Sequence, residues 1–196
     1  MFSVSGHVAR PGNYEIRLGT SFADLLEMAG GMRGGRRLKG VIPGGSSMPV
    51  LPGDTMMSLT MDYDALQKAG SGLGSGAVIV MDETTCMVRA CQRIARFYYA
   101  ESCGQCTPCR EGTGWMYRML TRIVDGRATM DDLQMLKGAA GQIEGHTICA
   151  FGEAAAWPVQ GFLRHFWAEF EYAIVNRRFY VDDVAAGRVA PSEQAA

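Results

Sequence analysis

The spacing of hydrophobic and polar residues divides this chain into two regions with different periods. In residues 1–75, short strand-like runs alternate with turns rich in glycine and proline. From about residue 83 to residue 180, longer segments repeat their hydrophobic residues at helical spacing. The pattern predicts an α+β chain, in which a small strand-containing domain precedes a helical domain.

The first region predicts a hairpin, a short helix and further short strands, in that order. Strand-like runs flank the Pro-Gly turn at residue 11, and a short apolar helix is expected to start after Ser21. Further strands are expected near residues 41–42 and 56–60, separated by Pro-Gly turns. This order is typical of a small β-grasp (ubiquitin-like) domain, which we expect over residues 1–75.

The second region predicts four amphipathic helices joined by short connections, which favours a four-helix bundle over residues 84–180. Pro108 suits the first position of the second helix, with Thr107 as its cap. The expected helices cover residues 84–100, 108–125, 129–145 and 158–178.

Two further segments complete the expected domain organisation. The run GSGLGSG at residues 70–76 could be mistaken for a phosphate-binding loop, but its strand-like run follows the glycines instead of preceding them. We therefore expect residues 76–83 to form a linker that includes a strand. The end of the chain, residues 181–196, is expected to be a flexible tail.

Composition and charge argue against two classes of partner. The net charge is −1, so no excess of basic residues favours nucleic acid or an anionic membrane surface. No apolar run is long enough for direct membrane insertion, and the first residues lack the pattern of a signal peptide. We expect a soluble intracellular protein, in which six cysteines are more typical of metal ligands or buried thiols than of disulfides.

Three cysteines at three-residue spacing lie in the motif ESCGQCTPC: Cys103, Cys106 and Cys109. Structural zinc sites often use paired Cys-x-x-Cys motifs, whereas a tight loop with three thiolates is typical of a 4Fe–4S cluster. Cys149 is the best candidate for the fourth ligand, because it lies in the connection before the fourth helix. In an antiparallel bundle, that connection and the one before the second helix lie at the same end.

Spacing alone leaves other ligand assignments open. Cys86 and Cys91 compete with Cys149, although both fall within the first helical pattern and suit buried thiols. His146 is three residues from Cys149 and could bind the metal or contact one of its ligands. A mononuclear zinc site and unligated thiols are the alternatives to a cluster.

The residues around the triplet suit an anionic cluster. The start of the second helix offers free backbone N–H groups and the positive end of the helix dipole. Arg110 adds positive charge there, unless it is a solvated residue of the helix surface. The chain has no serine nucleophile elbow and no HExxH motif, so an iron–sulfur protein with this sequence is most simply an electron carrier.

The sequence resembles one family through several motifs. ESCGQCTPCREG and TICAFGEAAAWP resemble the cluster-binding part of the NADH-binding flavoprotein subunit of respiratory complex I, the NADH:quinone oxidoreductase. SGHVARPGNYEI resembles that family's soluble-ligand-binding β-grasp domain, and MDETTCMVRACQ resembles the start of its helical bundle. The resemblance implies that Cys103, Cys106, Cys109 and Cys149 ligate a 4Fe–4S cluster.

The resemblance covers the C-terminal part of that family. The glycine-rich FMN and NADH site of the family's N-terminal half has no counterpart among these residues. The resemblance therefore implies an electron-transfer module of an NADH dehydrogenase, a translocase, in which the cluster relays electrons from NADH-reduced FMN toward the quinone. We expect the chain alone to be inactive with NADH.

The resemblance also implies partners and a location. The partners are the missing FMN- and NADH-binding domain and two peripheral-arm subunits, the thioredoxin-like 2Fe–2S subunit and the large iron–sulfur subunit. The location is cytoplasmic, peripheral to the inner membrane. One alternative is the diaphorase subunit of an NAD-reducing hydrogenase or of an NAD-dependent formate dehydrogenase, which shares these motifs. The other is a non-redox interaction module with a structural cluster.

Overall fold

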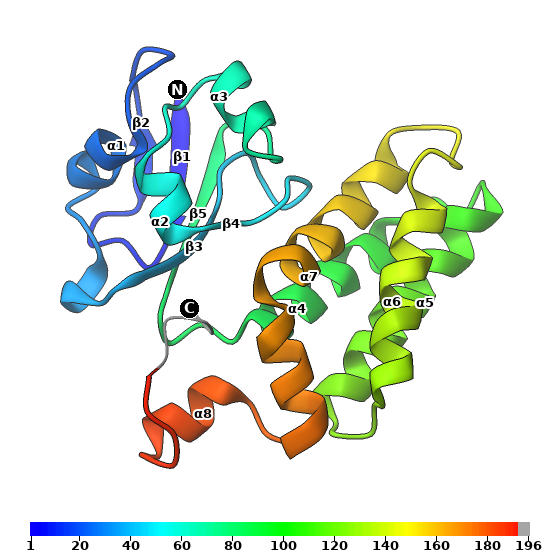
Figure 1. Ribbon diagram of the computed structural model, residues 1–196. Coiled ribbons are helices and arrows are strands. Elements are labelled where there is room, and N and C mark those ends of the chain that lie inside the picture. The colour runs from blue at the N-terminus through cyan, green and yellow to red at the C-terminus, as the bar shows by residue number, and fades with distance from the viewer. Residues whose placement is uncertain (192–196) are drawn as a thin grey trace. The chain divides into compact units, whose positions relative to one another are not determined.

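The structure is a computed structural model that describes residues 1–191, and it divides into two compact units (Figure 1). The first unit comprises residues 1–85, and the second begins at Cys86. The first contains strands and short helices, and the second contains helices. This is the α+β organisation that the hydrophobic pattern predicts.

The first unit is built on a five-stranded sheet with the strand order β2-β1-β5-β3-β4. Its strands are β1 (Phe2–Gly6), β2 (Gly12–Tyr14), β3 (Leu38–Ile42), β4 (Leu51–Pro52) and β5 (Ala77–Asp82). β5 lies at the centre, parallel to β1 and antiparallel to β3, while β2 and β4 pair antiparallel at the two edges. The first and last strands of the unit are therefore neighbours, as the β-grasp prediction requires.

Short helical segments connect the strands of the first unit: α1 (Phe22–Met28), the 3-10 turn η1 (Arg33–Gly35), α2 (Gly53–Met57) and α3 (Tyr63–Lys68). α1 begins where the Ser21 Oγ accepts a hydrogen bond from the Asp24 N–H at 3.0 Å. Leu25 of α1 and Val41 and Val80 of the sheet are fully buried in the core beneath it. The apolar face of α1 is thus what fixes the helix to the sheet.

The prediction of a strand at residues 56–60 is wrong. Met56 lies in α2 and is fully buried. Pro52 has an extended conformation just before the helix, and Asp54 lies in its first turn, where a carboxylate interacts favourably with the helix dipole. These local signals outweigh the strand-like run that follows them.

The boundary between the units falls after Thr85, later than the expected end of the first domain. Residues 76–83 contain β5, so they belong to the centre of the sheet and do not link two domains. At the end of β5, the carboxylate of Asp82 accepts hydrogen bonds from Arg36 Nη1 at 3.1 Å and from the Thr84 N–H at 3.0 Å. These contacts hold the exit of β5 against the first unit.

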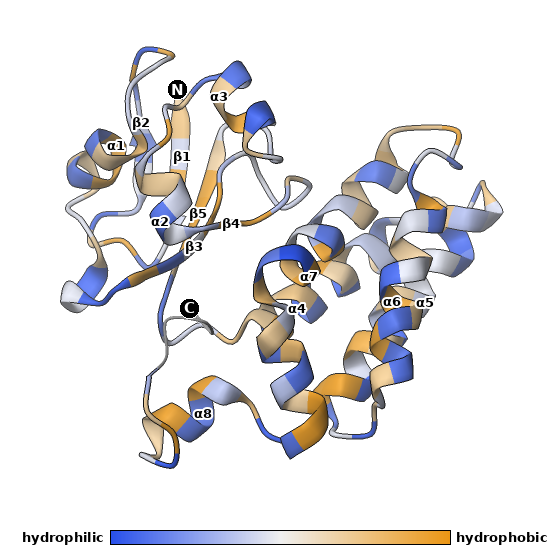
Figure 2. Ribbon diagram, in the orientation of Figure 1, coloured by the Kyte–Doolittle hydropathy of each residue, from blue (hydrophilic) through white to orange (hydrophobic). Residues whose placement is uncertain are grey.

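The second unit contains α4 (Met87–Glu101), α5 (Thr107–Val124), α6 (Met130–Ile143), α7 (Phe151–Asn176) and α8 (Tyr180–Ala185). α4 and α6 each contact both α5 and α7, so the four long helices form the predicted bundle. Figure 2 shows hydrophilic and hydrophobic residues alternating along these helices, as expected where one face of each helix is buried.

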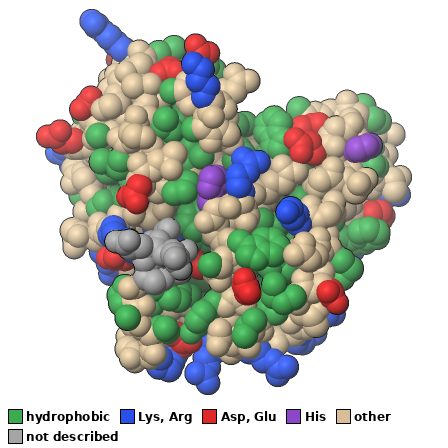
Figure 3. All heavy atoms as spheres, in the orientation of Figure 1, with side chains coloured by type: hydrophobic (Ala, Val, Ile, Leu, Met, Phe, Trp, Pro, Cys, Tyr) green, Lys and Arg blue, Asp and Glu red, His purple; other side chains and the backbone are tan. Residues whose placement is uncertain are grey.

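Hydrophobic, acidic and basic side chains are mixed over the visible face of each unit in Figure 3. Within the part of the chain that the structure describes, none of the helices combines the length and the apolar character needed to cross a membrane.

α7 begins at Phe151, earlier than the expected start at Pro158. Pro158 lies inside the helix, where it has no N–H to donate to the preceding turn. Ala155, Val159 and Phe162, on either side of the proline, are fully buried in the bundle. Packing of this face outweighs the lost hydrogen bond, because most helical stability in proteins comes from tertiary burial.

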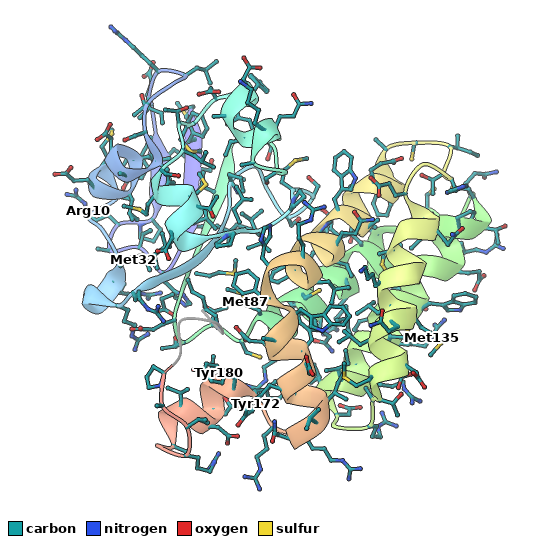
Figure 4. The ribbon with its side chains drawn as sticks, viewed as in Figure 1. Arg10, Met32, Met87, Met135, Tyr172 and Tyr180 are labelled. Atoms are coloured by element: carbon teal, nitrogen blue, oxygen red, sulfur yellow. The ribbon has the colours of Figure 1, made fainter. Side chains whose placement is uncertain are left out.

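α8 occupies the start of the segment that was expected to be a flexible tail, residues 181–196. The Asp183 carboxylate is buried and accepts a hydrogen bond from the Tyr172 hydroxyl of α7 at 2.7 Å. The rings of Tyr172 and Tyr180 also meet edge to face, with centroids 5.6 Å apart (Figure 4). These contacts with α7 hold α8 in place, so this part of the expected tail is a helix. Residues 192–196 of the expected tail lie outside the described residues.

Candidate metal centre

The cysteine triplet spans the connection from α4 to α5 and the first turn of α5, and Cys149 lies in the connection from α6 to α7. Figure 1 shows these two connections, green and yellow, at the same end of the bundle. This is the antiparallel arrangement predicted from the short connections. We refer to Cys103, Cys106, Cys109 and Cys149 together as the cysteine group.

The members of the cysteine group differ in exposure. Cys109 is 4% exposed, because it lies on the buried side of the first turn of α5. Cys106 is the residue before the first turn of that helix and is partly exposed. Cys103 and Cys149 are exposed. One thiol is therefore shielded by the bundle, while two are open to solvent or to a partner.

The thiols of the cysteine group interact electrostatically. Burial raises the pKa of Cys109, and a hydrogen bond with Ser102 opposes this effect. The negative charges of Cys106, Cys103 and Cys149 raise the pKa of Cys109 further. Cys149 thus acts on Cys109 although the two residues come from different connections. Thiolates that repel one another in this way favour a bound cation, which removes the repulsion.

The Ser102 hydroxyl lies next to the buried thiol. Its oxygen is 3.2 Å from the Cys109 Sγ and accepts a hydrogen bond from the Gly104 N–H at 3.3 Å. Arg110 Nη1 donates to the Gly104 carbonyl oxygen at 3.3 Å. Arg110, expected to add positive charge here, is therefore held against the backbone of the loop that carries the triplet.

The connection that carries Cys149 is fixed to α7 at its beginning. The Glu144 carboxylate accepts hydrogen bonds from Trp157 Nε1 at 2.7 Å and from Gln160 Nε2 at 2.8 Å. The bonds from Gln160 and Trp157 hold the pKa of Glu144 below its usual range. Next to it, the Gly145 N–H donates to the Glu153 carboxylate at 3.0 Å. No sequence motif indicated this network, which joins residues on different elements.

Close packing around Thr147 shapes the same connection further along. The Thr147 hydroxyl donates to the Cys149 carbonyl oxygen at 2.8 Å. A Cβ atom placed on Gly152, in the first turn of α7, would lie 2.2 Å from the Thr147 Oγ1. Gly152 is therefore needed for the approach of Thr147, a role that the sequence did not reveal.

The other candidate ligands are two cysteines at or near the start of α4 and one histidine in the connection that carries Cys149. Cys86 precedes the first turn of α4, and Cys91 lies within that helix. Both are buried, and burial raises the pKa of both thiols, as expected for structural cysteines. His146 is exposed, and its Nδ1 lies 2.9 Å from the Glu144 carbonyl oxygen, so this nitrogen has a backbone partner.

The donor set fits a 4Fe–4S cluster. Across residues 1–191, no three Cys, His, Asp or Glu side chains are arranged to hold a single metal ion. A 4Fe–4S cluster has a different requirement, since four cysteine thiolates each bind a separate iron. Four thiols gathered from two connections at one end of a bundle supply such a set.

Comparisons with known proteins agree with this chemistry. Residues 89–173 match the family described as the NADH-ubiquinone oxidoreductase-F iron-sulfur binding region, and residues 1–51 match the SLBB domain. All members of the cysteine group fall within the first match. The cofactor of this region is a 4Fe–4S cluster.

Individual relatives extend the likeness to most of the chain. The F subunit of the NADH-quinone oxidoreductase of Rickettsia rickettsii is 53% identical over 176 residues, which are 89% of this chain and 42% of that protein. An F subunit of the Rhizobium meliloti enzyme is 54% identical over 176 residues, with a share of 89% of this chain and 41% of the relative. The chain thus spans about two fifths of the length of these curated relatives.

A solved structure shares the fold. The crystal structure of an NAD+-reducing NiFe hydrogenase in the H2-reduced state superposes with a TM-score of 0.79 and 31% sequence identity, over 95% of this chain and 32% of that one. This agreement confirms the α+β fold class. The chain is therefore similar to F subunits of NADH-quinone oxidoreductases over about two fifths of their length, and it contains regions that match the SLBB domain and the iron–sulfur binding region.

Proposed function

We propose that this chain is an electron-transfer module of an NADH:quinone oxidoreductase, complex I, and that its cysteine group ligates one 4Fe–4S cluster. The observation that carries the proposal is that the triplet and Cys149 lie on two connections at the same end of the bundle (Figure 1). A fourth thiol at that end supports the proposal, because a 4Fe–4S cluster takes four cysteine ligands.

Each part of the cysteine group has its own task in this proposal. Cys109 anchors the site to the bundle, because it is buried in the first turn of α5. Cys106 places its thiolate at the start of α5, where free N–H groups and the helix dipole favour negative charge. The exposed Cys103 and Cys149 leave one side open to a redox partner. The bound cluster supplies one-electron acceptance and donation.

The electron donor and acceptor belong to the whole protein, of which this chain spans a part. In this proposal, NADH-reduced FMN on a domain outside these residues is the donor, and the quinone is the final acceptor. The partners are that domain, the thioredoxin-like 2Fe–2S subunit and the large iron–sulfur subunit. The assembly is cytoplasmic and peripheral to the inner membrane, and this chain alone is inactive with NADH.

Two other functions compete with this one. One is that of a diaphorase subunit of an NAD-reducing hydrogenase or a formate dehydrogenase, and the hydrogenase structure supports it. The sequence identity to that structure is 31%, lower than the 53% identity to the Rickettsia rickettsii F subunit, so this function is supported less well. A non-redox interaction module is supported by the SLBB domain at residues 1–51. A cluster that cannot be reduced reversibly would favour this last function.

The ligand assignment is tested by measuring iron and acid-labile sulfide per chain after anaerobic reconstitution. We expect about four of each in the unaltered chain and a clear loss in Cys149→Ser, because serine removes one thiolate. Cys86→Ser is the matched control: Cys86 precedes the first turn of α4, where serine is a favoured cap, so its iron content should be normal. Unchanged iron in Cys149→Ser would remove Cys149 from the ligand set.

A further inference from the structure

Ser102 is placed where it can act on one member of the cysteine group. It directly follows the last residue of α4, and its hydroxyl oxygen lies 3.2 Å from the Cys109 Sγ. Cys109 is the buried member, whereas Cys103 and Cys149 are exposed. A hydrogen bond shielded from water is electrostatically stronger than one in solvent. Any effect of a hydroxyl on the site should therefore be largest at this sulfur.

The hydrogen bonds around Ser102 determine which atom donates. The Ser102 oxygen already accepts from the Gly104 N–H at 3.3 Å, which leaves its single proton available. A cysteine that ligates a metal is a thiolate and has no proton to donate. Once Cys109 is a ligand, the 3.2 Å contact can exist as a hydrogen bond only with Ser102 as the donor.

The loop around Ser102 maintains this orientation. Gly104 has a φ of 74°, a conformation that side chains other than glycine rarely adopt. Arg110 Nη1 binds the Gly104 carbonyl oxygen at 3.3 Å and so fixes the peptide that follows the hydroxyl. The Ser102 oxygen is thus held beside the Cys109 sulfur.

We propose that the Ser102 hydroxyl donates a hydrogen bond to the Cys109 thiolate and thereby raises the reduction potential of the bound cluster. One-electron reduction adds negative charge to the cluster and its sulfur ligands, and a donor at a ligand sulfur stabilises the more negative state. Ser102 is thus a positioning residue that acts through Cys109. The inference rests on the proposed function, because it takes Cys109 as a ligand.

The test is a potentiometric titration of the reconstituted 196-residue chain, followed by EPR. In Ser102→Ala, we expect full iron and sulfide and a more negative midpoint potential. A shift of the reduction equilibrium by about three- to tenfold is expected, where tenfold corresponds to about 59 mV for one electron. Ser58→Ala is the matched control, since the Ser58 hydroxyl binds the Thr55 carbonyl in the first unit, and its potential should not move.

Ser102→Thr and Ser102→Val form a second test with side chains of nearly equal volume. Threonine keeps the hydroxyl and should keep the original potential, while valine should show the shift of the alanine variant. Equal potentials in the two variants, or an unchanged potential in Ser102→Ala, would overturn the inference. Loss of the cluster from both the Ala and Val variants but not from Thr would also overturn it, because the hydroxyl would then serve assembly.

The two proposals fail in different ways. If the unaltered chain takes up no cluster, the proposed function fails before Ser102 is considered. If the unaltered chain holds a reducible cluster and the hydroxyl does not affect its potential, only the role of Ser102 fails.

Discussion

Gly152 follows Cys149 by about one turn of helix and has no room for a side chain. A Cβ atom there would lie 2.2 Å from the Oγ1 and 2.5 Å from the Cγ2 of Thr147. Thr147 in turn binds the Cys149 carbonyl oxygen. We expect Gly152→Ala to displace the Cys149 connection at a cost of about 1–3 kcal/mol. The measurement is the rate at which the cluster absorbance is lost in the presence of an iron chelator, which should rise.

Gly141 provides the matched control on a neighbouring helix. It lies within α6, and a Cβ atom there would meet nothing within 4 Å. Gly141→Ala should leave the loss rate unchanged and stabilise the helix by about 1 kcal/mol, since alanine is the better helix former. Equal loss rates in the unaltered chain and Gly152→Ala would show that the packing of Thr147 does not position Cys149.

At the scale of elements, α6 depends on the side chain of Asp132. The Asp132 carboxylate accepts a hydrogen bond from the Thr129 N–H at 2.7 Å and one from Arg122 at 3.1 Å. We expect Asp132→Ala to lower the free energy of unfolding by about 1–2 kcal/mol, because it removes one half of a capping box. Urea unfolding of the cluster-free chain at neutral pH measures this change, and the exposed Asp131→Ala, in the same turn, should change it by less than about 0.5 kcal/mol.

The contribution of Asp132 should depend on pH. Hydrogen bonds from Thr129 and Arg122 outweigh burial and hold the pKa of Asp132 below its ordinary value of 3.8. A carboxylate whose pKa is lower in the folded state stabilises the protein above the unfolded pKa, and this stabilisation is lost as the pH falls through the folded pKa. The difference between Asp132→Ala and the unaltered chain should therefore shrink below about pH 3.8. A difference independent of pH would contradict the role of the ionised carboxylate.

Where a local sequence signal marks the start of a helix, the sequence predicted that start. Where a helix depends on contacts between distant residues, its start could not be predicted. Ser21, Pro108 and Thr129 each mark a helix start that the structure confirms to within a residue or two. The cap predicted at Thr107 is wrong, because Thr107 is the first residue of α5 and Cys106 before it makes no side-chain cap bond. The start of α7 was not predictable, because burial on both sides of Pro158 carries the helix through it. α8 was missed because its partner, Tyr172, lies on another helix.

The candidate site divides in the same way. The triplet was visible because its spacing is local, and Cys149 could be added because short connections fix which ends of the helices meet. Ser102 and Glu144 were not singled out, since their roles depend on atoms that only the folded chain brings within hydrogen-bond distance. The assignment of the cysteine group as ligands stays a prediction.

At the scale of the whole molecule, the cysteine group lies entirely in the second unit. Metal binding is linked to folding, so removing the cluster should destabilise the unit that holds it. Amide hydrogen exchange, compared between the cluster-bound and the cluster-free chain, measures this loss of stability in each unit. We expect protection to fall in α5 and α7 and to stay unchanged in β1 and β5. Equal losses in both units would contradict a cluster held by the second unit alone.

The most direct test of the central claim is low-temperature EPR of the anaerobically reconstituted chain, before and after reduction with dithionite and again after reoxidation. The proposed relay predicts no signal in the oxidised chain, a spin-half signal after one-electron reduction, and loss of that signal on reoxidation. A chain that holds one zinc and no sulfide, or a cluster that dithionite destroys without a reversible signal, would contradict an electron-transfer role for the cysteine group.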